Sequence, residues 1–437
     1  MNRIILAASI AALATVAAPV GAQTQASPQP PATKASAPLE LRVEQLPAVL
    51  SGKTAAADFF TPSFLAVVSE AQFNQLTDQF IVQYGQPLKI TSVAPNGPHS
   101  AVITIEFEGA IANAEIAVEA TAPNKVVGLL IKGFALKGDS LAKIDAEFAT
   151  LPGASGYLIE KVAPDGARTQ IAGRNVAQQF AIGSTFKLYV LAELASQVDA
   201  GRRKWTDVVP LTVISHSSPA TQNWPRDTPV TLQTLATWMI SVSDNAATDA
   251  LIGVLGREAI EKKLALVGHS NPDKALPLLT TVEAFALKNN PALRKAFEAA
   301  TEAQQRALLE ERAADLTYEK VNLVALGSGP AAIDSIEWFA TPVDMAALLQ
   351  NMRSMHNETM LNIMSVNKGV SPASASKWAY LGYKGGSEPG VISMSFMGKS
   401  KAGDFYTVTG SWNNATANVE NAMFANLMGR LLDNVAG

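Results

Sequence analysis

The chain has 437 residues, of which 48% are apolar and 16% charged, and its formal net charge at pH 7 is -4. This length and composition are sufficient for two domains with cores of their own. A slightly acidic chain without a basic run gives no support for nucleic-acid binding. The sequence contains no cysteine, which excludes disulfides and thiolate metal sites, and its four histidines are scattered without ligand spacing. We therefore expect no metal and no cofactor.

The first 22 residues are typical of a cleaved export signal. Arg3 supplies a positive charge, residues 4–20 form an apolar run, and Val20-Gly21-Ala22 matches a small-residue cleavage site. An uncleaved anchor is the alternative, but the run is short and rich in alanine for a bilayer span. We expect a periplasmic protein without a stable membrane anchor. Residues 23–37, rich in Gln, Ser, Pro and Ala, are predicted to form a flexible linker.

Residues 38–137 predict a small α+β domain. Apolar side chains recur at helical spacing before Gly85, and alternation over 102–107, with apolar runs at 111–118 and 126–131, indicates strands. Helices packed on a curved antiparallel sheet fit this order, which resembles the nuclear-transport-factor-like cone fused to some enzymes. The segment holds no evident catalytic set. We therefore interpret it as a spacer or an interaction module.

Residues 138–437 predict a second, larger domain, in which strands come first and last and helices occupy the middle. We expect an antiparallel sheet built from both ends of this domain, an inserted helical lobe, and a ligand cleft between the two. The predicted elements of the two ends are Ser140–Phe148, Gly156–Val162, Thr169–Ile171, Trp378–Lys384, Val391–Met397, Phe405–Trp412 and Ala417–Leu432.

A serine at the start of a long apolar helix is the first candidate site residue. Gly183 predicts a tight turn, Ser184 follows it, and a long alanine-rich helix comes next. Lys187 lies three residues on, on the same helix face, and a lysine that has lost its proton can act as base for the serine hydroxyl. Taken alone, Ser184 also fits an ordinary helix cap. Two other Ser-x-x-Lys patterns, at Ser365 and Ser374, open no long periodic helix.

Two more motifs follow in order. Ser243-Asp244-Asn245 lies 59 positions after Ser184 (243 − 184), and Lys384-Gly385-Gly386-Ser387 comes among the predicted C-terminal strands. This order, with Ser184-Thr185-Phe186-Lys187 first, resembles the signature of class A β-lactamases and penicillin-binding proteins. The resemblance extends from about Gly138 to the end of the chain. It implies the fold of that family, an antiparallel sheet with a helical lobe.

The resemblance also implies a role for each motif residue. Ser184 would be the acyl-accepting nucleophile and Lys187 its base or proton relay. Ser243, supported by Lys384, would pass a proton to the leaving nitrogen, and Asn245 would bind the substrate amide. A simple helix cap is the alternative for the second motif.

The third motif would bind the substrate from its strand. Gly386 and Ser387 would contact the substrate, and the backbone N–H groups of Ser184 and Ser387 would form the oxyanion hole. Gly385 departs from the family, because many relatives carry at this position a hydroxyl that helps to hold the substrate carboxylate. Ser387 is the alternative source of that hydroxyl.

A second departure concerns the loop that carries, in this family, the glutamate for the deacylating water. The second and third motifs are 141 positions apart (384 − 243), more than in compact class A enzymes, and a helical insertion is predicted at about residues 284–325. The Glu-x-x-Leu-Asn pattern of that loop is absent. Glu283 is the nearest candidate, with a helix N-terminal acid as the alternative. Glu337 lies too close to Thr341-Pro342 to be the first choice.

The sequence thus predicts a periplasmic serine hydrolase of the class A β-lactamase type, which opens a β-lactam or a related amide or ester through an acyl-enzyme on Ser184. A cell-wall peptidase or esterase is the second hypothesis, and a penicillin-binding sensor that stays acylated is the third. The rate of deacylation separates the sensor from the two enzymes. We expect a monomer that binds a small molecule.

Overall fold

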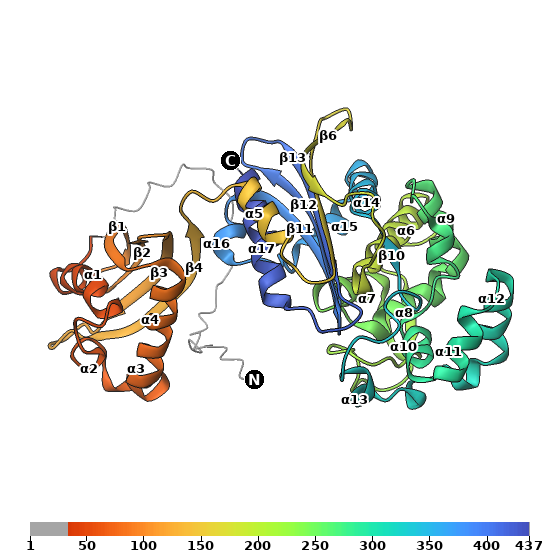
Figure 1. The fold of residues 1–437 in the computed structure, drawn as a ribbon, viewed down its shortest axis with the longest axis horizontal. Coiled ribbons are helices and arrows are strands. Elements are labelled where there is room, and N and C mark those ends of the chain that lie inside the picture. Colours follow the sequence, from red (N-terminus) through yellow and green to blue (C-terminus); the bar gives the residue numbers. More distant parts are fainter. Residues whose placement is uncertain (1–33, 437) are drawn as a thin grey trace, which may run out of the picture.

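The computed structural model describes residues 34–436, which form two domains joined by the short segment 137–140 (Figure 1). The predicted export signal, residues 1–22, and most of the predicted linker lie outside the described residues. Both domains combine helices with an antiparallel sheet, which confirms the predicted α+β class. Across residues 34–436, no helix is long and apolar enough to cross a membrane.

The N-terminal domain packs four helices against one antiparallel sheet. Its strands follow one another in chain order, and alternate residues of the second strand are buried, as a sheet covered on one face requires. Its core, which includes Phe60, Phe73 and Phe107, is separate from the cores of the larger domain. The elements are α1 (Ala37–Leu50), α2 (Ala56–Phe59), α3 (Pro62–Val67), α4 (Glu70–Tyr84), β1 (Pro87–Gly97), β2 (Ser100–Phe107), β3 (Ala110–Val118) and β4 (Val126–Leu136).

A five-stranded antiparallel sheet forms the centre of the larger domain. Its spatial order is β11-β12-β13-β5-β6, so strands from the end of the chain pair with strands from the start of the domain. This order confirms the prediction that both ends build the sheet. The strands are β5 (Ala154–Val162), β6 (Arg168–Arg174), β11 (Trp378–Glu388), β12 (Val391–Ser400) and β13 (Phe405–Asn413).

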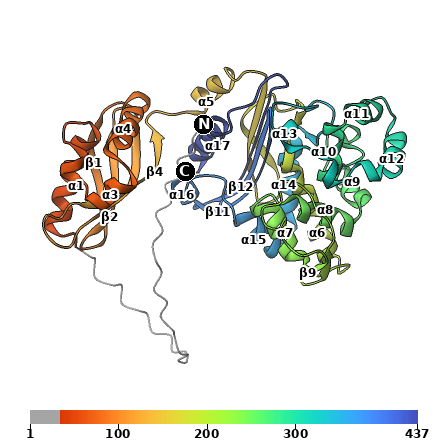
Figure 2. The ribbon, with the colours of Figure 1, turned by 90° about the horizontal axis from the view of Figure 1, so that it is seen from below.

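Helices cover both faces of this sheet. On one face, α5 (Leu141–Phe148) and α17 (Asn421–Val435) pack together, and Phe148 and Phe424 belong to a single core with side chains of the sheet. The helical lobe lies on the other face, as the view from below shows (Figure 2). There α14 (Pro342–Ser354) packs against the sheet. The boundary between lobe and sheet is therefore the place for a cleft.

The helical lobe is built around α6 (Lys187–Asp199). The side chains from Leu188 to Ala195 are all buried, which explains why this helix is apolar on nearly every side. The predicted insertion at about 284–325 holds α10 to α13. The remaining elements are α7 (Leu232–Ser241), α8 (Asn245–Leu255), α9 (Arg257–Leu266), α10 (Thr281–Asn289), α11 (Pro291–Glu298), α12 (Glu302–Glu311), α13 (Leu323–Leu326), α15 (Glu358–Ser365), α16 (Pro372–Ala375) and the short strand pairs β7 (Phe180–Ala181) with β10 (Phe339–Ala340) and β8 (Val208–Leu211) with β9 (Thr228–Thr231).

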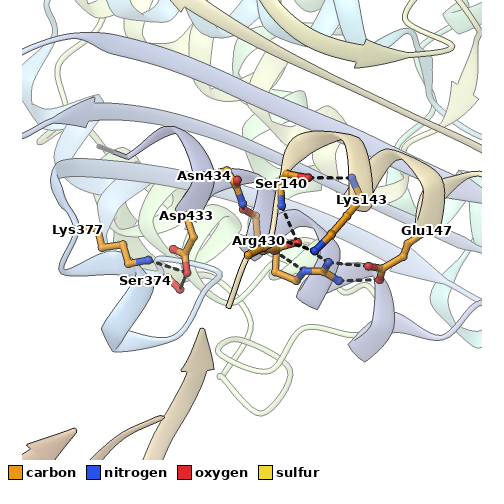
Figure 3. A network of polar contacts seen from close by, with 10 residues as sticks. Ser140, Lys143, Glu147, Ser374, Lys377, Arg430, Asp433 and Asn434 are labelled. Atoms are coloured by element: carbon orange, nitrogen blue, oxygen red, sulfur yellow. Dashed lines mark hydrogen bonds and ion pairs between the residues drawn. The ribbon is translucent and has the colours of Figure 1, made fainter. Parts of the chain in front are cut away.

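Arg430 of α17 ties the start of the larger domain to its last helix. Its guanidinium donates hydrogen bonds to both oxygens of Asp139 (2.9 Å each) and to both oxygens of Glu147 (2.6 Å each). Figure 3 shows Arg430 facing Glu147, with the ion pair of Lys377 and Asp433 nearby. Hydrogen bonds from Arg430 to the two carboxylates raise its pKa. These charge-assisted hydrogen bonds thus hold the first residues of the larger domain against α17, on the face of the sheet opposite the helical lobe.

Candidate active site

A short strand and a 3₁₀ turn bring Ser184 to the boundary between the sheet and the helical lobe. The side-chain amide of Asn413, at the end of β13, bonds both the N–H and the carbonyl of Ala181 (2.8 and 2.9 Å). Gly183 then has a φ of 47°, in the left-handed region that glycine tolerates, and the turn Gly183–Phe186 leads directly into α6. No side chain caps this turn or α6, so the half-buried Ser184 is not acting as a helix cap.

Strand β11 packs against this turn. Among the described strands β11 pairs only with β12, so its other edge can face Ser184. A Cβ at Gly386 would lie 2.3 Å from the carbonyl oxygen of Ile182 and 2.5 Å from the nitrogen of Ser184, so the position has room only for glycine. A Cβ at Gly183 would lie 3.4 Å from the nitrogen of Ser387. The backbone nitrogens of Ser184 and Ser387 therefore lie on neighbouring segments, as an oxyanion hole made by the two requires.

Lys187 is fully buried beside the second motif. Its Nζ donates hydrogen bonds to Ser243 O (2.7 Å), Ser243 Oγ (3.2 Å) and Asn245 Oδ1 (2.5 Å). Burial lowers the pKa of Lys187 to about 7, although the charges of Asp249 and Asp244 act in the opposite direction. Within residues 34–436, Lys187 makes no hydrogen bond to the Ser184 hydroxyl, which differs from the expected contact, since the second motif holds the amine instead.

Ser243 connects the two lysines of the site, because its Oγ accepts hydrogen bonds from Lys187 (3.2 Å) and Lys384 (3.0 Å). Its φ of 60° is uncommon for a residue with a side chain. Asp244 fixes this backbone: its carboxylate caps α8 and accepts the N–H groups of residues 220–221. A helix cap is thus present in this motif, but Asp244 provides it. The strained backbone places the Ser243 hydroxyl between the two amines.

The side chains of Asn245 and Lys384 are both held by hydrogen bonds to neighbouring residues. Asn245 Nδ2 donates to the carbonyl of His216 (2.9 Å) while its Oδ1 binds Lys187, so one N–H of the amide remains for a substrate. Lys384 Nζ donates to Ser243 Oγ and to Gly385 O (2.5 Å). Burial, together with the nearby charge of Lys187, lowers the pKa of Lys384 well below its ordinary value. Neither amine of the site is therefore strongly held in its charged form.

A cavity of about 770 Å³ lies between the Ser184 turn, the segment that follows α7, and β11. A larger hollow, of about 1070 Å³, lies between α1 and β1 in the N-terminal domain, but no residue of the three motifs lines it. The smaller cavity is therefore our candidate active site. The predicted site residues that line it are Ser184, Ser243, Asn245, Lys384, Gly386 and Ser387.

Glu283 does not line this cavity. Its Oε1 accepts a hydrogen bond from Arg257 (2.6 Å), and its Oε2 accepts the N–H of Thr280 (2.8 Å), which completes a capping box at the start of α10. Both oxygens are thus engaged in holding the helix start. The alternative weighed for Glu283, a helix N-terminal acid, describes its position, and the neighbouring Thr281 lines the cavity instead.

Two other glutamates line the cavity: Glu337, which is not the first choice from the sequence, and Glu388, which is not among the predicted site residues. Glu337 and Glu388 both accept hydrogen bonds from Lys288 Nζ, at 2.7 and 2.5 Å. Burial, and then the charge of Glu337, raises the pKa of Glu388 well above its ordinary value. Burial opposes the charge on Lys288, but the two carboxylates outweigh it and raise the pKa of Lys288. The three side chains form one buried charge cluster in the wall of the cleft.

The sequence carries a signal for only one member of this cluster. Glu388 directly follows Ser387 on β11, so its nearness to the third motif is readable. Glu337 reaches the cleft because Trp338 O accepts the N–H of Ile182 (2.9 Å), which places the segment before β10 beside the Ser184 turn. This contact joins residues far apart in the chain, and no local pattern indicates it.

An antiparallel sheet, a helical lobe, and a cleft that brings together two serines and two lysines define the class that the motifs indicate, a hydrolase of the β-lactamase type. The chain belongs to the beta-lactamase enzyme family, since the sequence model of that family matches residues 141–391, more than half of the chain. The N-terminal domain lies outside the matched range.

Solved structures similar to this chain include two β-lactamases and PBP-A. The β-lactamase from Sphaerobacter thermophilus DSM 20745 is 19% identical, with 67% of this chain and 94% of that chain covered and a TM-score of 0.45. PBP-A is 16% identical, with 68% and 93% covered and a TM-score of 0.46. The β-lactamase from Chitinophaga pinensis DSM 2588 is also 16% identical, with 68% and 98% covered and a TM-score of 0.46. A comparison with curated protein sequences finds no match.

Proposed function

We propose that the protein is a periplasmic serine hydrolase of the class A β-lactamase type, which opens a β-lactam or a related amide or ester through an acyl-enzyme on Ser184. The observation that carries the proposal is the contact of one hydroxyl, Ser243 Oγ, with both Lys187 and Lys384 in the cleft that Ser184 lines. The family of the chain supports the reaction class. The periplasmic location rests on the export signal predicted at residues 1–22.

In the proposed acylation, the Ser184 oxygen attacks the substrate carbonyl. Neutral Lys187, three residues on, exchanges a bond to the second motif for one to the Ser184 hydroxyl and takes its proton. The backbone N–H groups of Ser184 and Ser387 stabilise the oxyanion. Ser243 gives a proton to the leaving nitrogen or oxygen and regains one from the amines that contact it. The bond to the leaving group then breaks, and the acyl group remains on Ser184 as an ester.

Acylation is expected to rise with pH up to about 7. Because burial lowers the pKa of Lys187 to about 7, the amine is protonated and useless as a base below that pH, and it is neutral above it. The rate of labelling by a fluorescent penicillin should therefore fall about tenfold per pH unit below the pKa. Lys187→Arg should remove this rise, because a guanidinium stays protonated. Lys377→Arg, in another Ser-x-x-Lys pattern, should keep it. A flat wild-type profile would exclude Lys187 as the base.

We assign the activation of the deacylating water to Glu337. It is a carboxylate in the lining of the cleft, where Glu283 is not. Glu388 also lines the cleft, but its raised pKa favours the protonated form, which cannot accept a proton. Glu337 Oε1 accepts a hydrogen bond from Lys288 (2.7 Å), and its Oε2 accepts the N–H of Trp338 (3.2 Å). These bonds hold the carboxylate in place, and each oxygen keeps a second lone pair for a water molecule in the cleft.

Glu337→Gln is expected to acylate normally but to release the acyl group about 10²- to 10⁴-fold more slowly, because a general base contributes about that much. Intact-protein mass spectra recorded after mixing with a chromogenic cephalosporin measure the adduct, and absorbance measures its hydrolysis. Glu283→Gln is the matched control, since glutamine also completes a capping box, and it should clear the adduct like the wild type.

Other results of this experiment would indicate a different catalytic base or a different function. If the acyl-enzyme accumulates in Glu283→Gln but is hydrolysed normally in Glu337→Gln, Glu283 is the general base. A stable adduct on the wild type would support the penicillin-binding sensor. Hydrolysis of small esters without any reaction with the cephalosporin would favour the peptidase or esterase. If neither the fluorescent penicillin nor the chromogenic cephalosporin forms an adduct, the proposed function is overturned.

A further inference from the structure

The third motif lacks a side chain at Gly385, and a tyrosine hydroxyl occupies the place where that side chain would begin. Tyr383 and Gly385 are two residues apart on β11 and so face the same side of the strand. A Cβ built on Gly385 would lie only 2.0 Å from Tyr383 Oη. Tyr383 can therefore hold this orientation only because residue 385 has no side chain.

The Tyr383 ring is fixed from two sides. A Cβ at Gly369 would lie 2.5 Å from the ring, so a glycine lets the loop after α15 close onto it, and the ring of Phe396 packs against it at 4.8 Å between centroids. Tyr383 lines the same cavity as Ser184. The ring thus packs against the core on the α5 and α17 face of the sheet, and Tyr383 lines the cavity from that face.

The Tyr383 hydroxyl is available as a donor. Within residues 34–436 it has no hydrogen-bond partner, in contrast to Tyr380 on the same strand, whose hydroxyl donates to Leu361 O (2.9 Å). Burial raises the pKa of Tyr383 to about 12, so the proton stays on the oxygen at neutral pH. A substrate acceptor would therefore meet a neutral O–H group at this point.

The charges around the cavity disfavour a carboxylate there. Among the described residues that line it, the charged ones are Glu337, Lys384 and Glu388, and none is an arginine. Lys384 already donates to Ser243 and to a backbone carbonyl, and burial makes its positive charge unfavourable. The two glutamates share a single cation, Lys288. An incoming carboxylate would meet no free cation among these residues and would lie in the same cavity as Glu337.

We propose that Tyr383 is a specificity-determining residue, and that this cleft selects an amide or ester whose group next to the scissile bond is an uncharged hydrogen-bond acceptor rather than a carboxylate. The inference rests on the proposed acyl-enzyme mechanism and narrows its substrate class. A neutral ester or amide carbonyl accepts the Tyr383 O–H, and no buried charge has to be compensated. β-Lactams that carry a free carboxylate beside the ring are then secondary substrates.

The test compares a chromogenic cephalosporin with its methyl ester, in which an added methyl group removes the charge of the carboxylate. Acylation of the full-length protein by each reagent is followed by intact mass, and peptide mapping locates the adduct. We expect the ester to acylate the wild type severalfold faster than the free acid, because placing a carboxylate in the cleft without a free cation costs more than placing a neutral ester there. Tyr383→Phe should slow the ester about 2- to 10-fold, the usual effect of losing one neutral hydrogen bond. Tyr380→Phe, whose hydroxyl lies outside the cavity, should leave the ratio of the two rates unchanged.

Faster acylation by the free acid, or an ester rate that Tyr383→Phe does not alter, would overturn the inference and leave the proposed function intact. If neither reagent modifies Ser184, the proposed function fails, and the inference falls with it. A slower ester reaction in both tyrosine variants would point to a general loss of packing on β11 and would also count against a specific role for Tyr383.

Discussion

Replacing Ser184 with alanine is expected to abolish acylation by penicillins and to lower any hydrolysis by a factor on the order of 10⁶, the scale seen when a serine hydrolase loses its nucleophile. The turn has two hydroxyls, but Thr185 is fully buried and donates to Ser393 O, whereas Ser184 lines the cavity. No side chain in this turn caps the helix, so removal of the Ser184 hydroxyl should not disturb the fold. Fluorescent penicillin labelling measures the reaction, and thermal unfolding checks the fold.

The chain provides matched controls for this substitution in its two other Ser-x-x-Lys patterns. Ser365 Oγ donates to Asn362 O (3.0 Å), and Ser374 Oγ donates to Asp433 Oδ2 (3.1 Å), so both hydroxyls serve the local structure. Alanine at either position should leave labelling unchanged. If labelling persists in Ser184→Ala and maps to Ser365 or Ser374, the assignment of the nucleophile is wrong.

Gly386→Ala is expected to have the next largest effect, a loss of about 10²- to 10³-fold in acylation, comparable to removing one donor of an oxyanion hole. The new methyl group would lie 2.3 Å from Ile182 O, 2.5 Å from Ser184 N and 2.6 Å from Thr185 N. All three are backbone atoms that cannot rotate away, so β11 or the nucleophile turn has to move. Either movement separates the N–H groups of Ser184 and Ser387.

Gly429→Ala in α17 is the control for the general effect of replacing glycine with alanine. Nothing lies within 4 Å of a Cβ at that position, and alanine favours a helix. This variant should acylate like the wild type. Acylation rates are best compared well below the unfolding temperature, because the overlap at Gly386 also destabilises the fold by about 1–3 kcal/mol. A Gly386→Ala protein that is folded and acylates at the wild-type rate would show that β11 does not form the oxyanion hole.

The order of short motifs carried most of what could be predicted about the cleft. Ser184, Ser243 and Lys384 each lie at a recognisable place, at the start of a buried helix, at the end of another helix, or on a strand near the C-terminus. Alternating and helical apolar patterns likewise predicted a sheet made from both ends of the domain. Such patterns show which face of a helix or strand is buried. This information is enough to place the three motifs at the boundary between the sheet and the helical lobe.

The side-chain partners in the cleft follow from packing between distant segments, which local patterns do not record. Lys187 contacts Ser243 and Asn245 instead of Ser184, because α8 begins next to its amine. For Glu283, a local signal was present: Thr280-x-x-Glu283 is the spacing of a capping box, and the structure contains that box. For Glu337 no such signal exists, since the contact between Trp338 and Ile182 brings it to the cleft.

The pairing of β5 with β13 affects how the larger domain folds. Ala154 lies opposite Asn413, 259 positions further on (413 − 154), so the middle of the sheet closes a very long loop. Contacts so distant in sequence form slowly, whereas helices of the lobe meet neighbours closer in the chain. Ser387 reaches the Ser184 turn only when β11 has joined this sheet. The proposed reactivity of Ser184 is therefore among the last properties that the folding chain acquires, and a partly synthesised chain carries an inert serine.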